Sequence, residues 1–317
     1  MTEATADSGL APLEWTKRGR LIDPPTGQPW AHSHAMLPTV EALDANRLAL
    51  LYSPRDERGR GYVARAHVEI AQDGRLVLLA HDPDPVLAPG SLGAFDDNGA
   101  TAACVVQRED DTLLYYGGWT LGVTVPFYAY AGLAIRPAGE RDFTRVSRAP
   151  LLERTAIDPY LANTPWVMRD GGLWRMWYSS CVRWEMIDGA ACHFYHVRYA
   201  ESADGVEWRR DGRVAIDFGD RSEVALSRPC VVRDSDRYRM WFSVRGKHYR
   251  LGYAESRDGL TWDRDDDGAG LEPSPGEWDA ETAYPAVFDH NGTRYMLYSG
   301  NGYGRAGIGY ATCRTPS

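Results

Sequence analysis

The chain contains 317 residues, of which 44% are hydrophobic and 25% are charged, and it carries a formal charge of −9 at pH 7. This composition is typical of a soluble globular protein with a sizeable core. The acidic balance argues against a nucleic-acid or anionic membrane partner, because both bind basic surfaces. No apolar run approaches the ~20 residues of a membrane span, and the polar N-terminal segment does not resemble a secretion signal, so we expect a cytoplasmic protein.

The cysteines are scattered along the chain and form no CxxC pair. An odd number of cysteines without metal-ligand spacing argues against a disulfide framework or a zinc site. We therefore expect reduced thiols at Cys104, Cys181, Cys192, Cys230 and Cys313.

The distribution of aromatic residues indicates an all-β protein. Eleven Trp and eighteen Tyr residues lie in short apolar runs that are broken by Gly, Asp and Asn. Such runs are typical of short strands between turns. The first predicted strand, 14–21, belongs to "LEWTKRGRLI", which nearly repeats "VEWRRDGRVAI" at 206–216.

Five units of similar sequence follow this strand, and each reads as four short strands. A first apolar strand and a polar turn lead to an aromatic strand such as "RYRMWFS", then a third strand such as "RLGYAES", an Asp-Gly turn and a fourth strand that opens on Trp. Asp-Gly between alternating runs favours a tight hairpin, because Gly supplies the positive φ. The units are anchored 56 to 65 residues apart by Pro38, Ala103, Pro165, Pro229 and Pro285.

Five such units predict a five-bladed β-propeller with four-stranded antiparallel blades. The blades are expected at 36–80, 101–147, 164–210, 228–264 and 284–312. Because the last unit lacks a fourth strand, we expect segment 14–21 to complete it beside 307–312 and to close the ring; an exposed N-terminal arm is the alternative. The chain 1–317 is thus predicted to form a single domain. No Asp/Asn-rich run demands a metal, so no cofactor is expected, and a Ca²⁺ ion in the central channel stays an option.

Two motifs carry a resemblance to a known group of proteins. The pattern P-x-V, then Y-x-M-W-Y-S, then Y-A-x-S-x-D-G-x-x-W resembles the five-bladed propeller glycosidases: glycoside hydrolase families forty-three and thirty-two and the mannoside phosphorylases of family one hundred and thirty. The resemblance spans nearly the whole chain and is sharpest from residue 163 to 312. It implies a carbohydrate-active enzyme whose ligand, a small glycoside or sugar-derived metabolite, binds in the mouth of the propeller.

Propeller geometry predicts which residues converge at this mouth. The start of each first strand and the end of each second strand open on the same side, and the loop entering each first strand adds ionisable groups. Aromatic side chains there would stack on sugars, while arginines would bind hydroxyls, carboxylates or phosphates. The predicted substrate-binding residues are His32, Trp119, Asp158, Asn163, Arg183, Arg228, Arg245, Lys247, Asp279, Tyr284 and Asn301.

Glycosyl transfer requires a protonated carboxyl group for the leaving oxygen and an ionised one to activate water. The predicted catalytic residues are Asp97, Glu223, Glu281 and His34. Arg228 is expected to meet a carboxylate or an anionic substrate, because an unpaired charge facing the channel is costly.

The sequence also departs from the family pattern. Leu37 and Asn163 occupy the places of two acidic residues that the resembled hydrolases carry. Three hypotheses therefore stay open: a glycoside hydrolase that uses displaced carboxylates or a histidine; a repurposed propeller that acts as a lyase, isomerase or cyclase; and a non-catalytic sugar-binding module. Two carboxyl groups across the mouth favour the first hypothesis, and a mouth of Arg and His favours the second.

Overall fold

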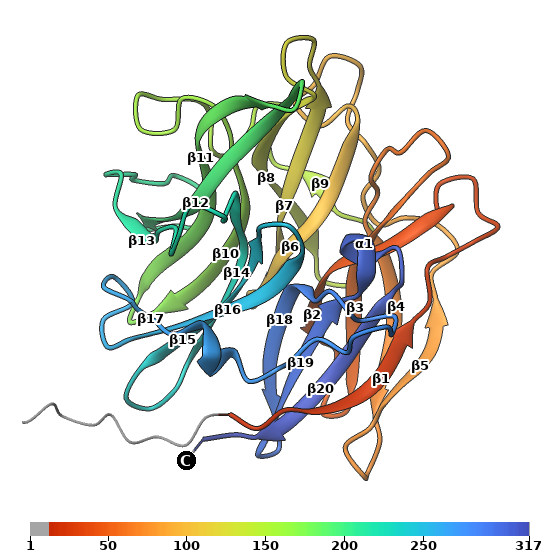
Figure 1. Ribbon diagram of the computed structural model, residues 1–317. Coiled ribbons are helices and arrows are strands. Elements are labelled where there is room, and N and C mark those ends of the chain that lie inside the picture. The colour runs from red at the N-terminus through yellow and green to blue at the C-terminus, as the bar shows by residue number, and fades with distance from the viewer. Residues whose placement is uncertain (1–12, 317) are drawn as a thin grey trace, which may run out of the picture.

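The computed structural model describes residues 13–316, and it confirms an all-β chain (Figure 1). Antiparallel pairing gathers the strands of these residues into five successive groups. The first group contains β2 (Ser33–Ala42), β3 (Arg47–Arg55), β4 (Ala64–Ile70) and β5 (Leu76–His81). The second contains β6 (Gly99–Gln107), β7 (Asp111–Leu121), β8 (Phe127–Pro137) and β9 (Thr144–Arg145).

The third group contains β10 (Ala162–Asp170), β11 (Leu173–Ile187), β12 (Ala190–Ser202) and β13 (Val214–Ile216). The fourth contains β14 (Ala225–Arg233), β15 (Tyr238–Arg245), β16 (Tyr249–Ser256) and β17 (Asp263–Arg264). The fifth joins β18 (Ala283–His290), β19 (Thr293–Ser299) and β20 (Ile308–Arg314) to β1 (Thr16–Ile22). Two short helical turns, η1 (Asp266–Ala269) and α1 (Asn301–Gly304), lie in loops.

The predicted pairing of the N-terminal strand with the last strand is present. β1 runs antiparallel to β20, with Thr16 opposite Thr312 and Ile22 opposite Ile308. The first strands of the groups lie at the middle of the molecule, where each contacts the next and β18 contacts β2 (Figure 1). The first and last groups therefore meet in space although they lie at opposite ends of the chain.

The repeated Asp-Gly motif forms the same turn at two places in the chain. Gly205 and Gly259 have φ values of 81° and 74°, as the hairpin prediction requires. The carbonyl oxygen of each turn glycine accepts a hydrogen bond from the preceding group: Tyr115 Oη lies 2.8 Å from Gly205 O, and Trp177 Nε1 lies 3.1 Å from Gly259 O. The motif thus connects neighbouring strand groups by hydrogen bonds.

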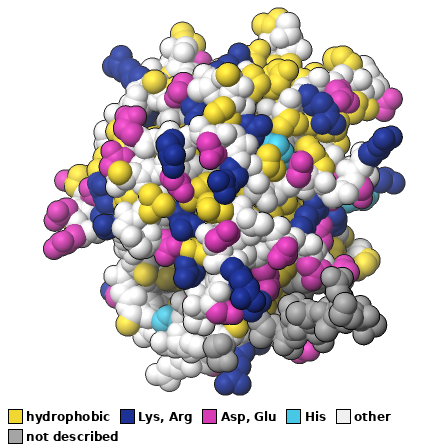
Figure 2. All heavy atoms as spheres, turned by 90° about the vertical axis from the view of Figure 1, so that its left-hand side faces the viewer, with side chains coloured by type: hydrophobic (Ala, Val, Ile, Leu, Met, Phe, Trp, Pro, Cys, Tyr) yellow, Lys and Arg dark blue, Asp and Glu magenta, His cyan; other side chains and the backbone are white. Residues whose placement is uncertain are grey.

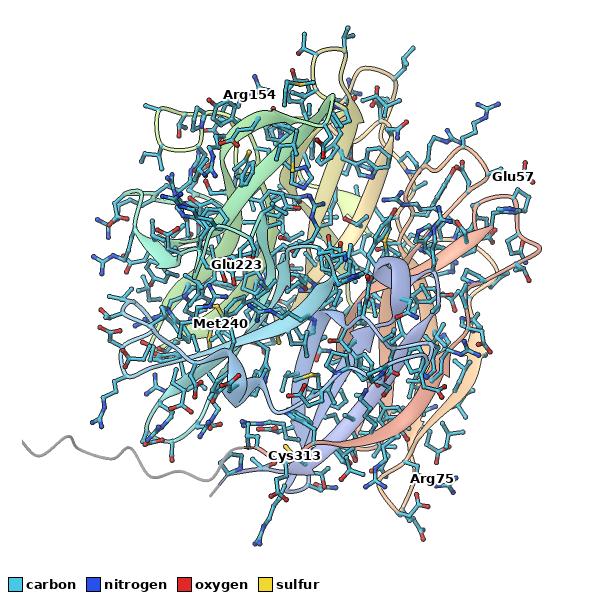
Figure 3. All side chains as sticks on the ribbon, in the orientation of Figure 1. Glu57, Arg75, Arg154, Glu223, Met240 and Cys313 are labelled. Atoms are coloured by element: carbon cyan, nitrogen blue, oxygen red, sulfur yellow. The ribbon has the colours of Figure 1, made fainter. Side chains whose placement is uncertain are left out.

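The apolar core lies between successive groups. The aromatic second strands supply fully buried side chains such as Trp177, Met240 and Trp241, and Met240 is labelled among the side chains in Figure 3. One cluster joins the first and fifth groups through residues such as Leu50 and Leu297. The cysteines are free, as predicted, and three of them are buried. On the face shown in Figure 2, basic and acidic side chains are interspersed.

Four first strands contain a left-handed residue just before their anchor proline. The φ values are 55° at Leu37, 45° at Thr164, 53° at Arg228 and 57° at Tyr284, and the strand register shifts at each of these positions. A positive φ is uncommon for residues with a Cβ atom, and a bulge redirects the side chain that it carries. Proline has no backbone N–H to donate to the strand ladder, so the bulge also accommodates the anchor proline that follows it.

Neither of the helical turns within residues 13–316 has the length and apolar character needed to cross a membrane.

Candidate functional site

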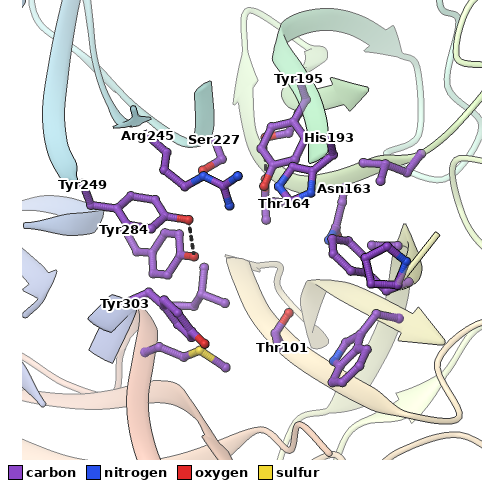
Figure 4. Close-up of a pocket in the computed structure, with 18 of the residues that line it drawn as sticks. Thr101, Asn163, Thr164, His193, Tyr195, Ser227, Arg245, Tyr249, Tyr284 and Tyr303 are labelled. Carbon is purple, nitrogen blue, oxygen red and sulfur yellow. Dashed lines mark hydrogen bonds between the residues drawn. The ribbon is translucent and has the colours of Figure 1, made fainter. Parts of the chain in front are cut away.

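A pocket of about 450 Å³ opens where the five strand groups converge (Figure 4). First strands contribute Leu37, Thr101, Thr164, Ser227 and Tyr284 to its wall, so three of the left-handed residues line it. The ends of second strands contribute Arg55, Trp119 and Arg245, as the propeller geometry predicts. The starts of third strands add Phe127, His193, Tyr195 and Tyr249, and α1 adds Tyr303.

One side of the pocket is formed by tyrosines around Arg245. The hydroxyl oxygens of Tyr249 and Tyr284 lie 3.5 Å apart, and Figure 4 shows Arg245 between these two tyrosines and Tyr195. Arg245 and Tyr249 are held together because they are partners in the β15–β16 ladder. Burial, with Tyr249 and Tyr195 close by, raises the pKa of Tyr284 well above its ordinary value. The Tyr284 hydroxyl therefore stays protonated at neutral pH.

The other side is aromatic and contains a neutral imidazole. The rings of Phe127 and His193 lie edge to face at 5.3 Å, and His193 stacks on Tyr195 at 4.7 Å. Burial, with a smaller contribution from Arg245, lowers the pKa of His193 to about 3. The guanidinium of Arg55 lies 5.6 Å from the rings of both Trp119 and Tyr303, within cation–π range.

Three lining residues carry a buried polar atom without a hydrogen-bond partner: Arg55 Nε, Asn163 Oδ1 and His193 Nε2. Buried polar atoms are normally satisfied, so these three atoms mark places in the pocket wall where a polar partner is missing. Asn163 Oδ1 is a hydrogen-bond acceptor, and Arg55 Nε is a donor.

The charge of the pocket is one-sided. Arg55 and Arg245 line it, and no Asp or Glu among the described residues does. Guanidinium groups form paired, charge-assisted hydrogen bonds with carboxylates and phosphates. The pocket is therefore suited to an anionic ligand, and it does not contain the carboxyl pair that inverting hydrolysis requires.

Three of the predicted carboxylates lie in ion pairs that support the fold instead of the pocket. Buried Asp158 accepts hydrogen bonds from Tyr178 at 3.0 Å and from Arg210 at 2.9 Å. Asp279 is bound in the same way by Tyr298 and Lys17, at 3.0 and 2.7 Å.

Glu223 pairs with Arg264 at 2.6 Å. The second group contains an equivalent, Asp96, which pairs with Tyr116 and Arg145. The repeat thus places one buried carboxylate before a first strand in four groups, and a basic side chain neutralises each of them.

Three other predicted residues support the α1 turn that carries Tyr303. Asn301 Oδ1 accepts a hydrogen bond from Glu281 N at 2.7 Å, and the Glu281 carboxylate binds His248 at 2.8 Å. His34 stacks on Tyr303 at 5.2 Å. Burial, helped by Arg55 and Arg305, lowers the pKa of His34 to about 4. Glu281, Asn301 and His34 therefore contact the α1 turn but do not line the pocket.

Four predicted residues lie away from the pocket. Asp97 accepts a hydrogen bond from Gly93 N at 3.0 Å within its own loop. His32 is exposed and lies 3.9 Å from Glu57. Arg183 covers the ring of Phe194 at 3.9 Å and lines a separate surface hollow, and Lys247 is exposed.

Arg228 is fully buried and does not line the pocket. Of the two predicted partners, a carboxylate is not present among residues 13–316: the one side-chain hydrogen bond of Arg228 there goes to Pro38 O, at 2.6 Å. A buried guanidinium in the middle of the fold also opposes a Ca²⁺ ion there, because like charges repel. Among the described residues, no cluster of three or more His, Cys, Asp or Glu side chains could hold a metal.

Of the residues predicted from the sequence, the pocket brings together Trp119, Asn163, Arg245 and Tyr284. The sequence-based prediction missed His193, Tyr195 and Tyr249 because it placed no third-strand residue at the mouth. Antiparallel pairing places the start of a third strand opposite the end of a second strand, as Arg245 and Tyr249 show. That rule could have found them.

Comparison with solved structures defines the class of fold. The chain matches a "Glycoside hydrolase" with a TM-score of 0.72 at 17% identity, over 96% of this chain and 93% of that one. It matches a glycosyl hydrolase from Bacteroides ovatus with a TM-score of 0.73 at 13% identity, over 98% and 96%. A family 130 structure, described among hydrolases that target β-1,2 mannosidic linkages in Candida mannan, gives 0.69 at 14%, over 96% and 97%. The chain has the propeller fold of the glycosidase superfamily that its motifs resemble.

Comparison with curated proteins then gives the family. The chain is 42% identical over 300 residues to the uncharacterized proteins MT1551 and Rv1502 of two Mycobacterium tuberculosis strains. The alignments cover 94% of this chain and 99% of each relative. The chain therefore belongs to the same family as these mycobacterial proteins. No protein-family model matches the sequence.

Proposed function

We propose that this protein is carbohydrate-active and that its pocket binds an anionic, sugar-derived small molecule such as a uronate or a sugar phosphate. The observation that carries the proposal is that Arg55 and Arg245 both line a pocket whose described lining includes no carboxylate. The fold shared with glycoside hydrolases supports a sugar as the neutral part of the ligand.

In this proposal the two sides of the pocket have different tasks. Arg245, backed by Tyr195 and Tyr249, binds the anionic group. Trp119 and Tyr303 stack on the sugar ring, and the unpartnered Asn163 Oδ1 accepts a hydrogen bond from a hydroxyl. Aromatic faces with a few placed polar groups are typical of small-molecule sites.

For the reaction, the pocket favours lyase, isomerase or cyclase chemistry over hydrolysis by two carboxylates. An inverting pair would stand about 6.5–9.5 Å apart, and the predicted acids Asp97, Glu223 and Glu281 are engaged elsewhere. Arg245 would stabilise negative charge that develops beside a carboxylate, and the protonated Tyr284 hydroxyl would donate a proton to a leaving oxygen. Binding without turnover would favour the sugar-binding module.

We further propose that the five strand groups are the blades of one propeller domain over 1–317 and that β1 closes its ring. The contact of β18 with β2 and the pairing of β1 with β20 support this arrangement.

The test is calorimetric titration with D-glucuronate, D-glucose 6-phosphate and neutral D-glucose. We expect the anionic sugars to bind and glucose to bind at least about tenfold more weakly, since hydrogen bonds to charged groups contribute about 1.5–3 kcal/mol. Arg245→Met should lose at least about tenfold in affinity for the anionic sugars. Arg183→Met is the matched control, because Arg183 lies outside the pocket and should leave affinity unchanged. Equal affinity for all three sugars would refute the proposal.

A further inference from the structure

The pocket has an apolar part that the function proposed above does not use. The residues that form it, which we call the apolar wall, are Leu121, Pro126, Phe127, Ala129 and Leu161. None of these side chains carries a charge or a hydrogen-bonding group. Most of the apolar wall belongs to the β7–β8 hairpin of the second strand group, whereas Arg245 and Tyr284 come from the fourth and fifth groups. The lining therefore combines a polar part and an apolar part that different strand groups supply.

The fold fixes the position of the apolar wall. Leu121 and Phe127 are direct partners in the antiparallel ladder of β7 and β8, which run side by side in Figure 1. Side chains of directly opposed residues lie on the same face of a sheet, so both point toward the pocket that they line. The ring of Phe127 also packs edge to face against Trp184 at 5.7 Å and His193 at 5.3 Å. The wall is thus a formed surface that a ligand can meet without rearrangement.

The apolar wall is open to solvent, in contrast to the side chains of the core. Leu121 is 65% exposed, Pro126 is exposed and Phe127 is half-buried. Contact of apolar surface with water is unfavourable, and covering it favours binding in proportion to the area covered. A ligand that reaches these side chains therefore binds more tightly than one that leaves them in water.

The size and chemistry of the pocket indicate what covers the wall. A volume of about 450 Å³ lies within the range of about 300–1,000 Å³ that is typical of sites for drug-sized ligands, which are larger than a single sugar. A second sugar fits the apolar wall poorly, because its hydroxyl groups would lose water without gaining hydrogen-bond partners. An apolar group attached to the sugar meets no such cost.

We propose that the ligand of this pocket is a glycoside of an anionic sugar, and that its aglycone, the group on the anomeric oxygen, is apolar and packs against the apolar wall. The inference rests on the proposed function, in which Arg245 binds the anionic group. An aglycone on the anomeric oxygen leaves the carboxylate or phosphate of the sugar free for Arg245. The charged end then orients the ligand, and the apolar end adds affinity.

Calorimetric titration with methyl and phenyl D-glucuronides, each as the α and the β anomer, tests this inference. The two members of each pair share the sugar, the charge and the linkage, and they differ only in the apolar area of the aglycone. We expect the phenyl glucuronide of one anomer to bind about tenfold or more tightly than its methyl counterpart. Where D-glucose 6-phosphate is the anionic sugar that binds, methyl and phenyl 6-phospho-D-glucosides replace the glucuronides.

The outcomes separate this inference from the proposed function. Equal affinities of the methyl and phenyl glycosides in both anomers, or loss of binding with either aglycone, would overturn the inference and leave the binding of an anionic sugar intact. Failure of both D-glucuronate and D-glucose 6-phosphate to bind would refute the proposed function itself.

A pair of variants tests whether the apolar wall is the source of the added affinity. Leu121→Ser changes an exposed side chain of the wall, and it should reduce the ratio of phenyl to methyl affinity by at least about threefold. Val123→Ser is the matched control, because Val123 is fully exposed in the same hairpin but does not line the pocket, and it should keep the ratio. An unchanged ratio in Leu121→Ser would contradict packing of the aglycone against this wall.

Discussion

Two fully buried arginines solve the same electrostatic problem in opposite ways. Arg294 on β19 contacts Asp234 at 2.5 Å and Asp289 at 2.8 Å. These carboxylates hold the pKa of Arg294 above its ordinary value despite its burial. Arg228 on β14 has no such partner, and burial lowers its pKa to about 10. The fold neutralises the first arginine and leaves the charge of the second without a carboxylate partner.

The same distinction separates the outer strands of the molecule from its centre and pocket. Around the outer strands, buried carboxylates such as Asp158 and Asp279 are bound by basic side chains. At the centre and in the pocket, Arg55, Arg228 and Arg245 lack carboxylate partners among the described residues. Charge pairing thus marks the scaffold of this protein, and unpaired positive charge marks its centre and its pocket.

The largest expected effect comes from removing Arg294. Arg294→Met leaves Asp234 and Asp289 without this partner, and we expect the free energy of unfolding to fall by about 3 kcal/mol. Arg228→Met should cost about 1 kcal/mol or less, because it removes a charge that no carboxylate matches. Urea denaturation measures both values. A larger loss for Arg228→Met than for Arg294→Met would invert the comparison.

A smaller effect is expected at Asp279, which binds Lys17 and so connects β1 to the loop before β18. Burial opposes ionisation, but the hydrogen bonds from Lys17 and Tyr298 outweigh it and keep the pKa of Asp279 below its ordinary value. The ion pair therefore contributes stability above about pH 4, and this stability is lost as the pH falls further. Asp279→Asn should cost about 2 kcal/mol at pH 7 and progressively less in acid.

The measurement is the urea midpoint between pH 7 and pH 3. Asp23→Asn is the matched control, because Asp23 also pairs with a β1 residue, Arg20, but its side chain is 77% exposed. A constant difference between wild type and Asp279→Asn across this range would argue against a structural ion pair.

The smallest expected effect concerns His34, which is neutral at pH 7 and so needs no partner of opposite charge. Its pKa of about 4 in the folded protein lies below the value of about 6.5 in the unfolded chain. The unfolded state therefore binds a proton first, and stability declines as the pH falls from 6.5 to 4. His34→Asn, which tolerates the left-handed backbone, should flatten this decline by about 1 kcal/mol. Exposed His32→Asn should leave it unchanged, and an identical decline in His34→Asn would disprove the assignment.

Much of the fold could be predicted because its strands and turns follow from short sequence motifs that repeat along the chain. The Asp-Gly turns at Gly205 and Gly259 and the match between the segments at 13–22 and 206–216 gave the register of the strands. The anchor prolines also marked the points where four first strands bulge. These features depend on neighbouring residues, which a single sequence reveals.

The site was predicted less well because it depends on contacts between distant residues. The position of Asp158 before its strand did not reveal that Tyr178 and Arg210 converge on it. The hairpins that return Tyr195 and Tyr249 to the pocket differ in length and carry no repeat signal. Trp119 and Arg245 were found because the ends of second strands follow directly from the register.

The pairing of β1 with β20 also bears on how the protein is made. β1 can pair with β20 only after Thr312, the partner of Thr16, has been translated. The fifth sheet is therefore completed late in synthesis. Contacts between such distant residues slow folding, and an unpaired strand edge invites association with other chains. A circular permutant that places β1 directly after β20 would make this closing contact local, and we expect it to refold faster than the natural order of strands.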